Sequence, residues 1–328
     1  MVTRNPARER LSKGELSLGI GLRLARTVDI AAAMATCGFD WLFIDLEHGA
    51  MTLDTATQIS LAALTAGISP LVRVPAQQYS LATRALDGGA FGIVMPHVDT
   101  AEEANAIIEH LKYPPLGHRS IAGPMGQFGF GVVPTEEAAR VINAEALVVI
   151  MLETPQAIAN ADAIAAVKGV DVLLVGTNDL MMEMGLPGQF SHAEVVQAYE
   201  NVIAACRKHG KWPGMGGVYA EDLLAKYIAM GMRMIIAGSD LGLLMAGASE
   251  RAKFLRGQLA LESRAARLDC ECRDRSAKRV SLINNVRSAA RCVPRSPFDR
   301  QKHVSQLKAR KRRRRIGVRV QGQSLARR

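Results

Sequence analysis

The sequence alternates short, nearly continuous apolar segments with amphipathic or alanine-rich segments across residues 16–261. The apolar segments are residues 16–22, 41–46, 70–74, 91–98, 147–152, 170–176, 212–218 and 233–239. Their length and composition are typical of strands buried on both faces of a parallel sheet, and the segments between them are typical of helices. Eight such units in about 250 residues predict a (β/α)₈ TIM barrel.

A doubly wound open sheet is the alternative fold for alternating strands and helices. In its dinucleotide-binding form, a glycine-rich turn follows the first strand. The corresponding stretch here, "GIGLRLA" at residues 19–25, lacks the third glycine of that fingerprint. We therefore expect the barrel, and we place it in residues 1–264.

The net charge of +10 is distributed unevenly along the 328 residues. Residues 265–328 hold 20 of the 41 Lys and Arg but only 4 of the 31 Asp and Glu, which gives this segment a net charge of +16 and leaves −6 in residues 1–264. We expect residues 265–328 to form a basic tail of low order, because few apolar positions are available to offset the entropy of folding. Its run "KARKRRRR" could bind nucleic acid, although a nonspecific solvated extension is the favoured interpretation because the run lacks interleaved aromatic residues.

The sequence shows no run of about 18 apolar residues and no apolar segment near its start that would serve as a secretory signal. We therefore predict no membrane span and a cytoplasmic location. The five cysteines are irregularly spaced and fit neither a disulfide framework nor a four-cysteine zinc site. We expect them to be reduced thiols.

Two carboxylates follow neighbouring predicted strands, at the end of the barrel where active sites of this fold lie. Glu153 follows residues 147–152, and Asp179 follows residues 170–176. Two adjacent carboxylates raise each other's pKa unless a cation compensates them. We predict that they hold a divalent metal ion, Mg²⁺ or Mn²⁺ with Co²⁺ as a further option, whose remaining positions are filled by water and a chelating substrate. The alternative is that each carboxylate only caps a helix.

His48 lies just after the second predicted strand, where its near-neutral pKa range suits a general base acting beside a carbonyl group. A general base of this kind needs an orienting partner, and the sequence leaves open whether Asp45 or Asp87 takes that role.

Arg73 ends the third predicted strand, where a buried guanidinium requires a partner. It either pairs with Asp45 or Glu47 or stabilises negative charge that develops on the substrate.

Six motifs, taken together and in this order, resemble the HpcH/HpaI aldolase family, metal-dependent pyruvate aldolases that are related to the citrate lyase β subunit. The motifs are "GFDWLFIDLEHG", "LVRVP", "ALDGGAFGIVMPHVDTAEEA", "YPPLGHRS", "LETPQA" and "VGTNDLMMEMG". The resemblance covers residues 12–260.

The resemblance implies a barrel that assembles as a homo-oligomer, hexamer or dimer, with a helix exchanged between subunits. It implies a carbon–carbon lyase that cleaves or forms a 4-hydroxy-2-oxo acid, with pyruvate and an aldehyde as partners and a metal-stabilised enolate as intermediate. The turn of Gly176, Thr177 and Asn178 would lie against the substrate carboxylate.

The resemblance also implies a role for each candidate catalytic residue. Glu153 and Asp179 match the metal ligands, and His48 matches the acid–base residue. Asp87 matches the partner of His48 in a dyad, and Arg73 matches the residue that stabilises the enolate.

Several positions depart from the family pattern. Met151, Arg23 and Ser120 replace residues expected to face the substrate, which leaves the aldehyde partner open. Arg23 and Arg119 could bind a second carboxylate of the substrate, although salt bridges are the favoured interpretation.

The glycine-rich loop 117–131 is either a mobile lid or a plain connection.

Two other functions remain as alternatives. One is a citrate-lyase-like enzyme acting on a CoA thioester, which would need a more basic entrance than the acidic body suggests. The other is a non-catalytic barrel that binds nucleic acid through its basic tail.

Overall fold

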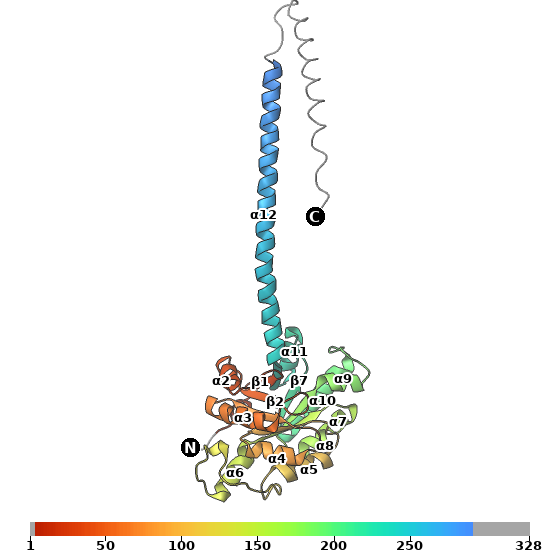
Figure 1. The fold of residues 1–328 in the computed structure, drawn as a ribbon. Coiled ribbons are helices and arrows are strands. Elements are labelled where there is room, and N and C mark those ends of the chain that lie inside the picture. The colour runs from red at the N-terminus through yellow and green to blue at the C-terminus, as the bar shows by residue number, and fades with distance from the viewer. Residues whose placement is uncertain (1–3, 291–328) are drawn as a thin grey trace, which may run out of the picture. The chain divides into compact units, whose positions relative to one another are not determined.

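The computed structural model describes residues 4–290, and its first compact unit, which ends at Ser249, contains a closed barrel (Figure 1). The strands are parallel and pair in sequence order from β1 to β8, and β8 pairs with β1 to close the barrel. The predicted (β/α)₈ TIM barrel is therefore confirmed. Within residues 4–290, no helix combines the length and the apolar character needed to cross a lipid bilayer.

Each strand overlaps one of the eight predicted apolar segments, with limits that differ by at most three residues. The strands are β1 (Ser17–Leu22), β2 (Trp41–Asp45), β3 (Ser69–Arg73), β4 (Gly92–Met95), β5 (Leu147–Leu152), β6 (Val172–Gly176), β7 (Trp212–Gly216) and β8 (Met234–Ser239).

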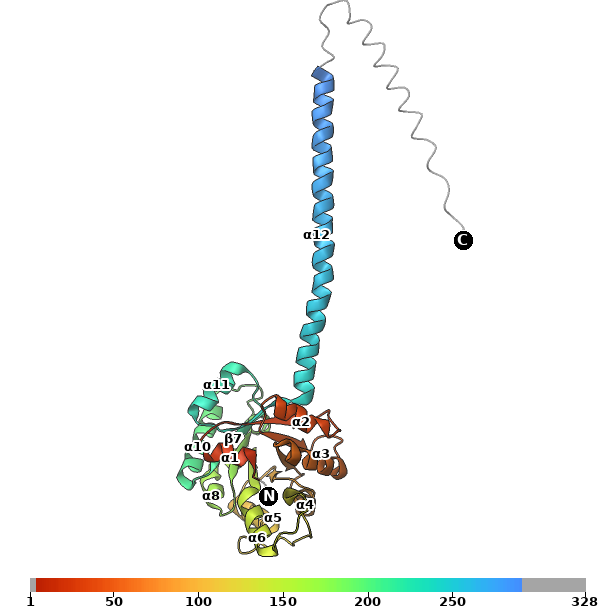
Figure 2. The same cartoon turned by 90° about the vertical axis from the view of Figure 1, so that its left-hand side faces the viewer.

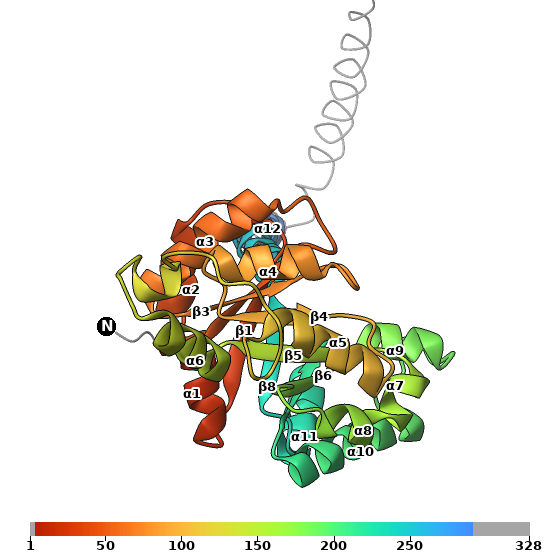
Figure 3. The same cartoon turned by 90° about the horizontal axis from the view of Figure 1, so that it is seen from below.

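The helices that connect the strands surround the barrel, as Figures 2 and 3 show from two further directions. They are α2 (Asp29–Thr36), α3 (Leu53–Ala66), α4 (Tyr79–Asp87), α5 (Ala101–Leu111), α6 (Thr135–Glu145), α7 (Pro155–Ala159), α8 (Ala161–Ala166), α9 (Thr177–Glu183), α10 (Ala193–His209) and α11 (Glu221–Met230), with the 3-10 turn η1 (Gly126–Phe128) before α6. The hydroxyls of Thr52, Thr100 and Thr154 accept backbone hydrogen bonds that start α3, α5 and α7.

Helix α1 (Pro6–Ser12) packs at the N-terminal end of the strands. The Asn5 side-chain amide donates to the Phe91 carbonyl at 2.9 Å, and the backbone N–H of Ala7 donates to the Ser69 hydroxyl at 3.0 Å. Ala7 and Leu11 belong to the same buried cluster as the side chains inside the barrel. Helix α1 therefore closes this end, and the opposite end, called the mouth below, remains for a site.

Side chains alternate between the barrel interior and the layer beneath the helices. In β2, Trp41 and Phe43 belong to the cluster that fills the interior. The other strand residues of this cluster are Leu71, Val94, Leu147, Val149, Met151, Val172, Leu174, Met234 and Ile236. The next inward positions toward the mouth are Asp45 on β2, Arg73 on β3 and Glu153 after β5. The alternation that builds the core thus also directs these three charged side chains to one place.

Helix α12 (Asp240–Ala290) follows β8 and continues into the second compact unit, residues 250–328. Residues 265–290 are helical, whereas the sequence predicted low order for them. This stretch contains no Gly or Pro, and pairs four residues apart join Arg273 to Asp269 at 3.2 Å and Lys278 to Asp274 at 2.6 Å, which favours a helix. The "KARKRRRR" run lies outside the described residues, and a domain limit at residue 264 stays a prediction.

Candidate active site

A cavity of about 120 Å³ opens at the mouth of the barrel. Of the eight candidate site residues predicted from the sequence, six line this cavity: His48, Arg73, Gly176, Thr177, Asn178 and Asp179. They come from the ends of β2, β3 and β6, strands that are not all adjacent in the barrel. Convergence of polar groups from separate strands at the mouth is the usual arrangement of an active site in this fold.

Arg73 is buried at the mouth and is held by two carboxylates. Its Nε and Nη2 donate to Asp45 Oδ1 and Oδ2 at 2.9 and 2.6 Å, and its Nη1 lies 2.9 Å from Glu47 Oε2. The guanidinium also lies over the Phe43 ring, 5.0 Å from its centre. The structure therefore shows the ion pair that the sequence allowed, with both candidate partners, while Arg73 still lines the cavity.

Asp45 organises the loop that carries His48. Its Oδ1 accepts hydrogen bonds from the backbone N–H groups of Glu47 and His48 at 3.0 and 3.2 Å. Burial on its own would raise the pKa of Asp45, but the hydrogen bonds and charge of Arg73, together with these N–H groups, hold the pKa below its usual value. Asp45 is therefore a stable anion that fixes both Arg73 and the loop.

The His48 ring stands at the rim of the cavity with 56% of its side chain exposed. Its Nε2 is 3.9 Å from Glu47 Oε2. A ring with a fixed backbone and an accessible nitrogen can exchange protons with a ligand in the cavity.

Glu153 is almost completely buried, and its Oε2 accepts a hydrogen bond from the backbone N–H of His97 at 2.8 Å. Burial is the main cause that raises the pKa of Glu153, and the negative charge of Asp179 raises it further. Gly176 makes room for this carboxylate, because a Cβ at residue 176 would lie 2.6 Å from Glu153 Cγ. The two carboxylates predicted as a pair are therefore brought close enough to influence each other.

His97, after β4, is a site residue that the sequence reasoning left as an ordinary hydrogen-bonding histidine. Its Nδ1 lies 3.4 Å from Glu153 Oε2 and its Nε2 lies 3.5 Å from Glu47 Oε1, so the ring bridges two carboxylates of the site. Its backbone has a φ of 53°, a left-handed conformation that is uncommon outside glycine. The sequence feature that could have marked His97 as a site residue is its position at the end of a predicted strand.

The chemistry of this cluster fits a divalent cation. No group of three or more His, Cys, Asp and Glu side chains within residues 4–290 is arranged to hold a metal by itself. Glu153 and Asp179 supply two carboxylates, and the charge of Asp179 adds to burial in raising the pKa of Glu153. A hard cation such as Mg²⁺ or Mn²⁺ accepts two carboxylates and fills its remaining positions with water and substrate oxygens.

The turn between β6 and α9 is fixed from within the barrel wall. The Thr177 hydroxyl is buried and lies 2.6 Å from both the Gly216 carbonyl and the Tyr199 hydroxyl. Asn178 and Asp179, by contrast, are exposed at the cavity. Gly176 and Thr177 thus form a rigid base from which the next two residues reach the ligand space.

Comparison with known proteins identifies the family. Residues 24–246 match the model of the family described as HpcH/HpaI aldolase/citrate lyase. The chain belongs to this family. The resemblance inferred from six motifs is therefore confirmed.

Two curated relatives of this chain are named as aldolases. The 4-hydroxy-4-methyl-2-oxoglutarate aldolase tasA of Hapsidospora irregularis is 41% identical over 76% of this chain and 93% of its own length. The enzyme of the same name from Chaetomium globosum, cghB, is 40% identical over 77% of this chain and 95% of its own length. The solved structure of an HpcH/HpaI aldolase from Desulfitobacterium hafniense matches with a TM-score of 0.72 at 30% identity, covering 76% and 96% of the two chains. This chain is accordingly an aldolase, a carbon–carbon lyase.

Asp87, the expected dyad partner of His48, lies at the end of the barrel opposite the mouth of its own chain. It ends α4, which returns from the mouth toward the N-terminal ends of the strands, because β4 begins there parallel to β3. Its Oδ1 accepts from Arg119 Nη2 at 2.6 Å, and among residues 4–290 no hydrogen bond or ion pair joins it to His48. Within one chain, Asp87 and His48 therefore lie at opposite ends of the barrel, because α4 runs from the mouth to the other end.

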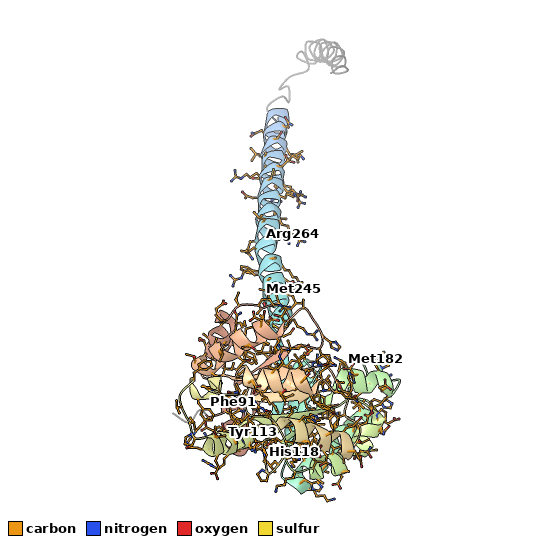
Figure 4. All side chains as sticks on the ribbon, turned by 60° about the horizontal axis from the view of Figure 1, so that its bottom comes forward. Phe91, Tyr113, His118, Met182, Met245 and Arg264 are labelled. Carbon is orange, nitrogen blue, oxygen red and sulfur yellow. The ribbon has the colours of Figure 1, made fainter. Side chains whose placement is uncertain are left out.

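The loop 117–131 also lies near the N-terminal end of the barrel, so it is not a lid over the cavity of its own chain. The Gln127 amide donates to the Leu86 and Ala90 carbonyls at 2.7 and 2.9 Å, which ties the loop to the segment between α4 and β4. Figure 4 labels Tyr113 and His118 in this region. Ser120 therefore does not face the cavity, whereas the other two departures from the family pattern, Met151 and Arg23, line it.

Proposed function

We propose that this aldolase cleaves the C3–C4 bond of a 4-hydroxy-2-oxo acid, releasing pyruvate and a carbonyl compound. The observation that carries the proposal is the set of groups around one cavity: the Glu153 and Asp179 carboxylates, the exposed His48 ring and the buried Arg73 guanidinium. Two relatives that are about 40% identical are named for 4-hydroxy-4-methyl-2-oxoglutarate. Cleavage of that compound between C3 and C4 would give two molecules of pyruvate.

Glu153 and Asp179 would hold a divalent metal ion. When bound, the ion would supply Lewis-acid stabilisation of the negative charge that develops on the 2-oxo group. The backbone of Gly176, Thr177 and Asn178 would lie against the substrate carboxylate. No lysine at a strand end is required in this scheme, because the reaction does not pass through a Schiff base.

The side chains at the mouth would move the proton and balance the charge. His48 Nε2 would accept the proton of the C4 hydroxyl as the C3–C4 bond breaks and its electron pair passes to C3. The same ring could return a proton to C3, which completes pyruvate. Arg73, held rigidly by Asp45 and Glu47, would place its positive charge beside the developing negative charge without reorganising.

Pyruvate release from 4-hydroxy-4-methyl-2-oxoglutarate, followed with a coupled dehydrogenase, tests this function. We expect a chelator to abolish activity and Mg²⁺, Mn²⁺ or Co²⁺ to restore it. His48→Ala should lower kcat/KM by about 10²- to 10³-fold, the usual contribution of a general base. His110→Ala is the matched control, because His110 is exposed on α5, contacts the Ala106 carbonyl and the Tyr79 ring, and does not line the cavity. Activity that persists in the chelator would overturn the metal assignment, and an unimpaired His48→Ala enzyme would overturn the role of His48.

We also propose that the enzyme works as a homo-oligomer. The part of α12 that belongs to the barrel unit exposes Leu241, Leu243, Leu244 and Met245, each with at least 42% of its surface accessible. Consecutive exposed apolar side chains are typical of a subunit interface. Light scattering on the purified full chain would measure the assembly, and a monomer at micromolar concentration would contradict it.

A further inference from the structure

Arg23 carries a positive charge at the cavity, and no carboxylate within residues 4–290 forms an ion pair with it. It follows β1, it is exposed, and it lines the cavity together with His48 and Asp179. Its guanidinium makes one hydrogen bond within residues 4–290, from Nη1 to the His48 carbonyl at 3.4 Å, and no ion pair. The sequence favoured a salt bridge for Arg23, and the structure does not contain one.

The two arginines that line the cavity therefore have different roles. Arg73 is buried, and its charge is neutralised by Asp45 and Glu47. Arg23 keeps most of its donors available. A guanidinium offers five N–H donors in a planar fork that matches a carboxylate, so an unpaired arginine facing a ligand cavity is suited to binding an anionic group.

The backbone of Arg23 is nevertheless firmly placed. The Asp240 carboxylate accepts hydrogen bonds from the backbone N–H groups of Arg23, Leu24 and Ala25 at 2.7 to 3.1 Å. Asp240 begins α12 directly after β8, so the loop after β1 is attached to the neighbouring strand end. A fixed backbone with a free side chain lowers the entropy cost of binding a ligand at the guanidinium.

The proposed reaction fixes which end of the substrate Arg23 can reach. The 2-oxo acid end would be taken by Glu153, Asp179 and the turn after β6. Arg23 directly follows β1, which is two strands away from β7 and three from β6 in the closed barrel order. It is therefore available for the part of the substrate beyond C4, which leaves as the second product.

We infer that Arg23 binds a carboxylate at the far end of the substrate and thereby selects 4-hydroxy-2-oxo acids that carry two carboxylates. This inference rests on the proposed function, since it presumes that the 2-oxo acid end is held at the mouth as described. Substrates with an uncharged far end would leave the guanidinium without a partner.

A pair of substrates that differ only at the far end tests the inference. One is 4-hydroxy-4-methyl-2-oxoglutarate, and the other is 4-hydroxy-4-methyl-2-oxopentanoate, in which a methyl group replaces the second carboxylate. The quantity to compare is the ratio of kcat/KM for the dicarboxylate to kcat/KM for the monocarboxylate. We expect Arg23→Gln to lower this ratio roughly 10- to 100-fold, the usual size of a charge-assisted contact, and Arg23→Lys to lower it less.

Arg26→Gln is the matched control. Arg26 lies on the same loop, but its guanidinium donates to the backbone carbonyls of Ala25 and Arg23 and does not line the cavity. Its removal should leave the ratio within about 2-fold of the wild-type value, the expectation for a position without direct substrate contact.

The outcomes separate the inference from the function on which it rests. A ratio that is unchanged in Arg23→Gln, while the wild type cleaves both compounds, would overturn the inference and leave the aldolase function standing. A ratio that falls equally in Arg26→Gln would also overturn it, because loop geometry would then be the cause. A wild type that cleaves neither compound would overturn the proposed function and the inference together.

Discussion

Each end of the barrel contains a buried arginine paired with an aspartate. At the mouth, Arg73 pairs with Asp45 and lies over Phe43, and at the opposite end Arg119 pairs with Asp87 and lies over Tyr113, 4.7 Å from the ring centre. The pairs are similar in chemistry, but Arg73 also contacts Glu47, which in turn contacts His97, and Arg73 lines the cavity. A buried ion pair by itself therefore does not mark an active site, whereas its position at the C-terminal ends of the strands does.

Cavity size does not distinguish the two ends either. A larger cavity, of about 270 Å³, opens near the N-terminal ends of β6 and β7 and is lined by Arg8, Lys112, Asp171 and Lys211. These groups satisfy one another or the backbone: Arg8 pairs with Asp171, and the Lys112 and Lys211 ammonium groups donate to main-chain carbonyls. Charges at this end hold the barrel together, and charges at the mouth remain available to a ligand.

The largest effect should follow from removing a carboxylate at the mouth. Glu153→Gln should lower kcat/KM by roughly 10³-fold, because the proposed cation site would lose one of its two carboxylates, Glu153 and Asp179. The pKa of Glu153 is raised by burial and by Asp179, so an uncharged amide should not lower the free energy of unfolding of the metal-free protein. Steady-state kinetics and urea unfolding check both statements, and a variant that is inactive because it is unfolded would contradict the second.

Asp45→Asn should reduce both stability and activity. Breaking a buried pair leaves Arg73 undercompensated, at a cost of about 3 kcal/mol in the free energy of unfolding at pH 7. The folded-state pKa of Asp45 is lowered, so its contribution is present above the unfolded value near 3.9 and is lost as the pH falls through the folded-state pKa. The stability difference between wild type and Asp45→Asn, measured by urea unfolding, should therefore shrink as the pH falls below about 5. A difference that is constant with pH would contradict this linkage.

Asp87→Asn should have the smallest effect on catalysis. It removes the carboxylate that pairs with Arg119 within residues 4–290, and we expect a loss of about 2 kcal/mol in the free energy of unfolding, less than for Asp45 because Asp87 is partly exposed. The value of kcat/KM should stay within about 3-fold of wild type, as for positions remote from the reacting atoms. A loss of activity far larger than the loss of stability would instead support the dyad that the family resemblance implied, and would require an Asp87 from a second copy of the chain.

The strands and the inward direction of the site residues were predictable because both depend on local patterns. Apolar runs of strand length predict the strands, and the alternation along β2 and β5 places Asp45 and Glu153 on the inner face. The location of Asp87 was also within reach of the sequence, since a helix that follows a barrel strand must end at the opposite side. The family resemblance pairs Asp87 with His48, and that pairing stays a prediction. Residues 265–290 lie within α12, and the low order expected for residues 265–328 as a whole stays a prediction.

The sequence by itself determined the barrel, the family and the strand ends at which His48, Arg73, Glu153 and Asp179 stand, because these follow from short-range periodicity and motif order. Only the tertiary structure decided the partners. Whether Arg73 is neutralised and Arg23 is not, whether His97 bridges two carboxylates, and how Asp240 anchors the loop after β1 depend on which strand ends meet in space. Contacts between residues far apart in the chain require the register and closure of the whole barrel, and no local pattern in the sequence specifies them.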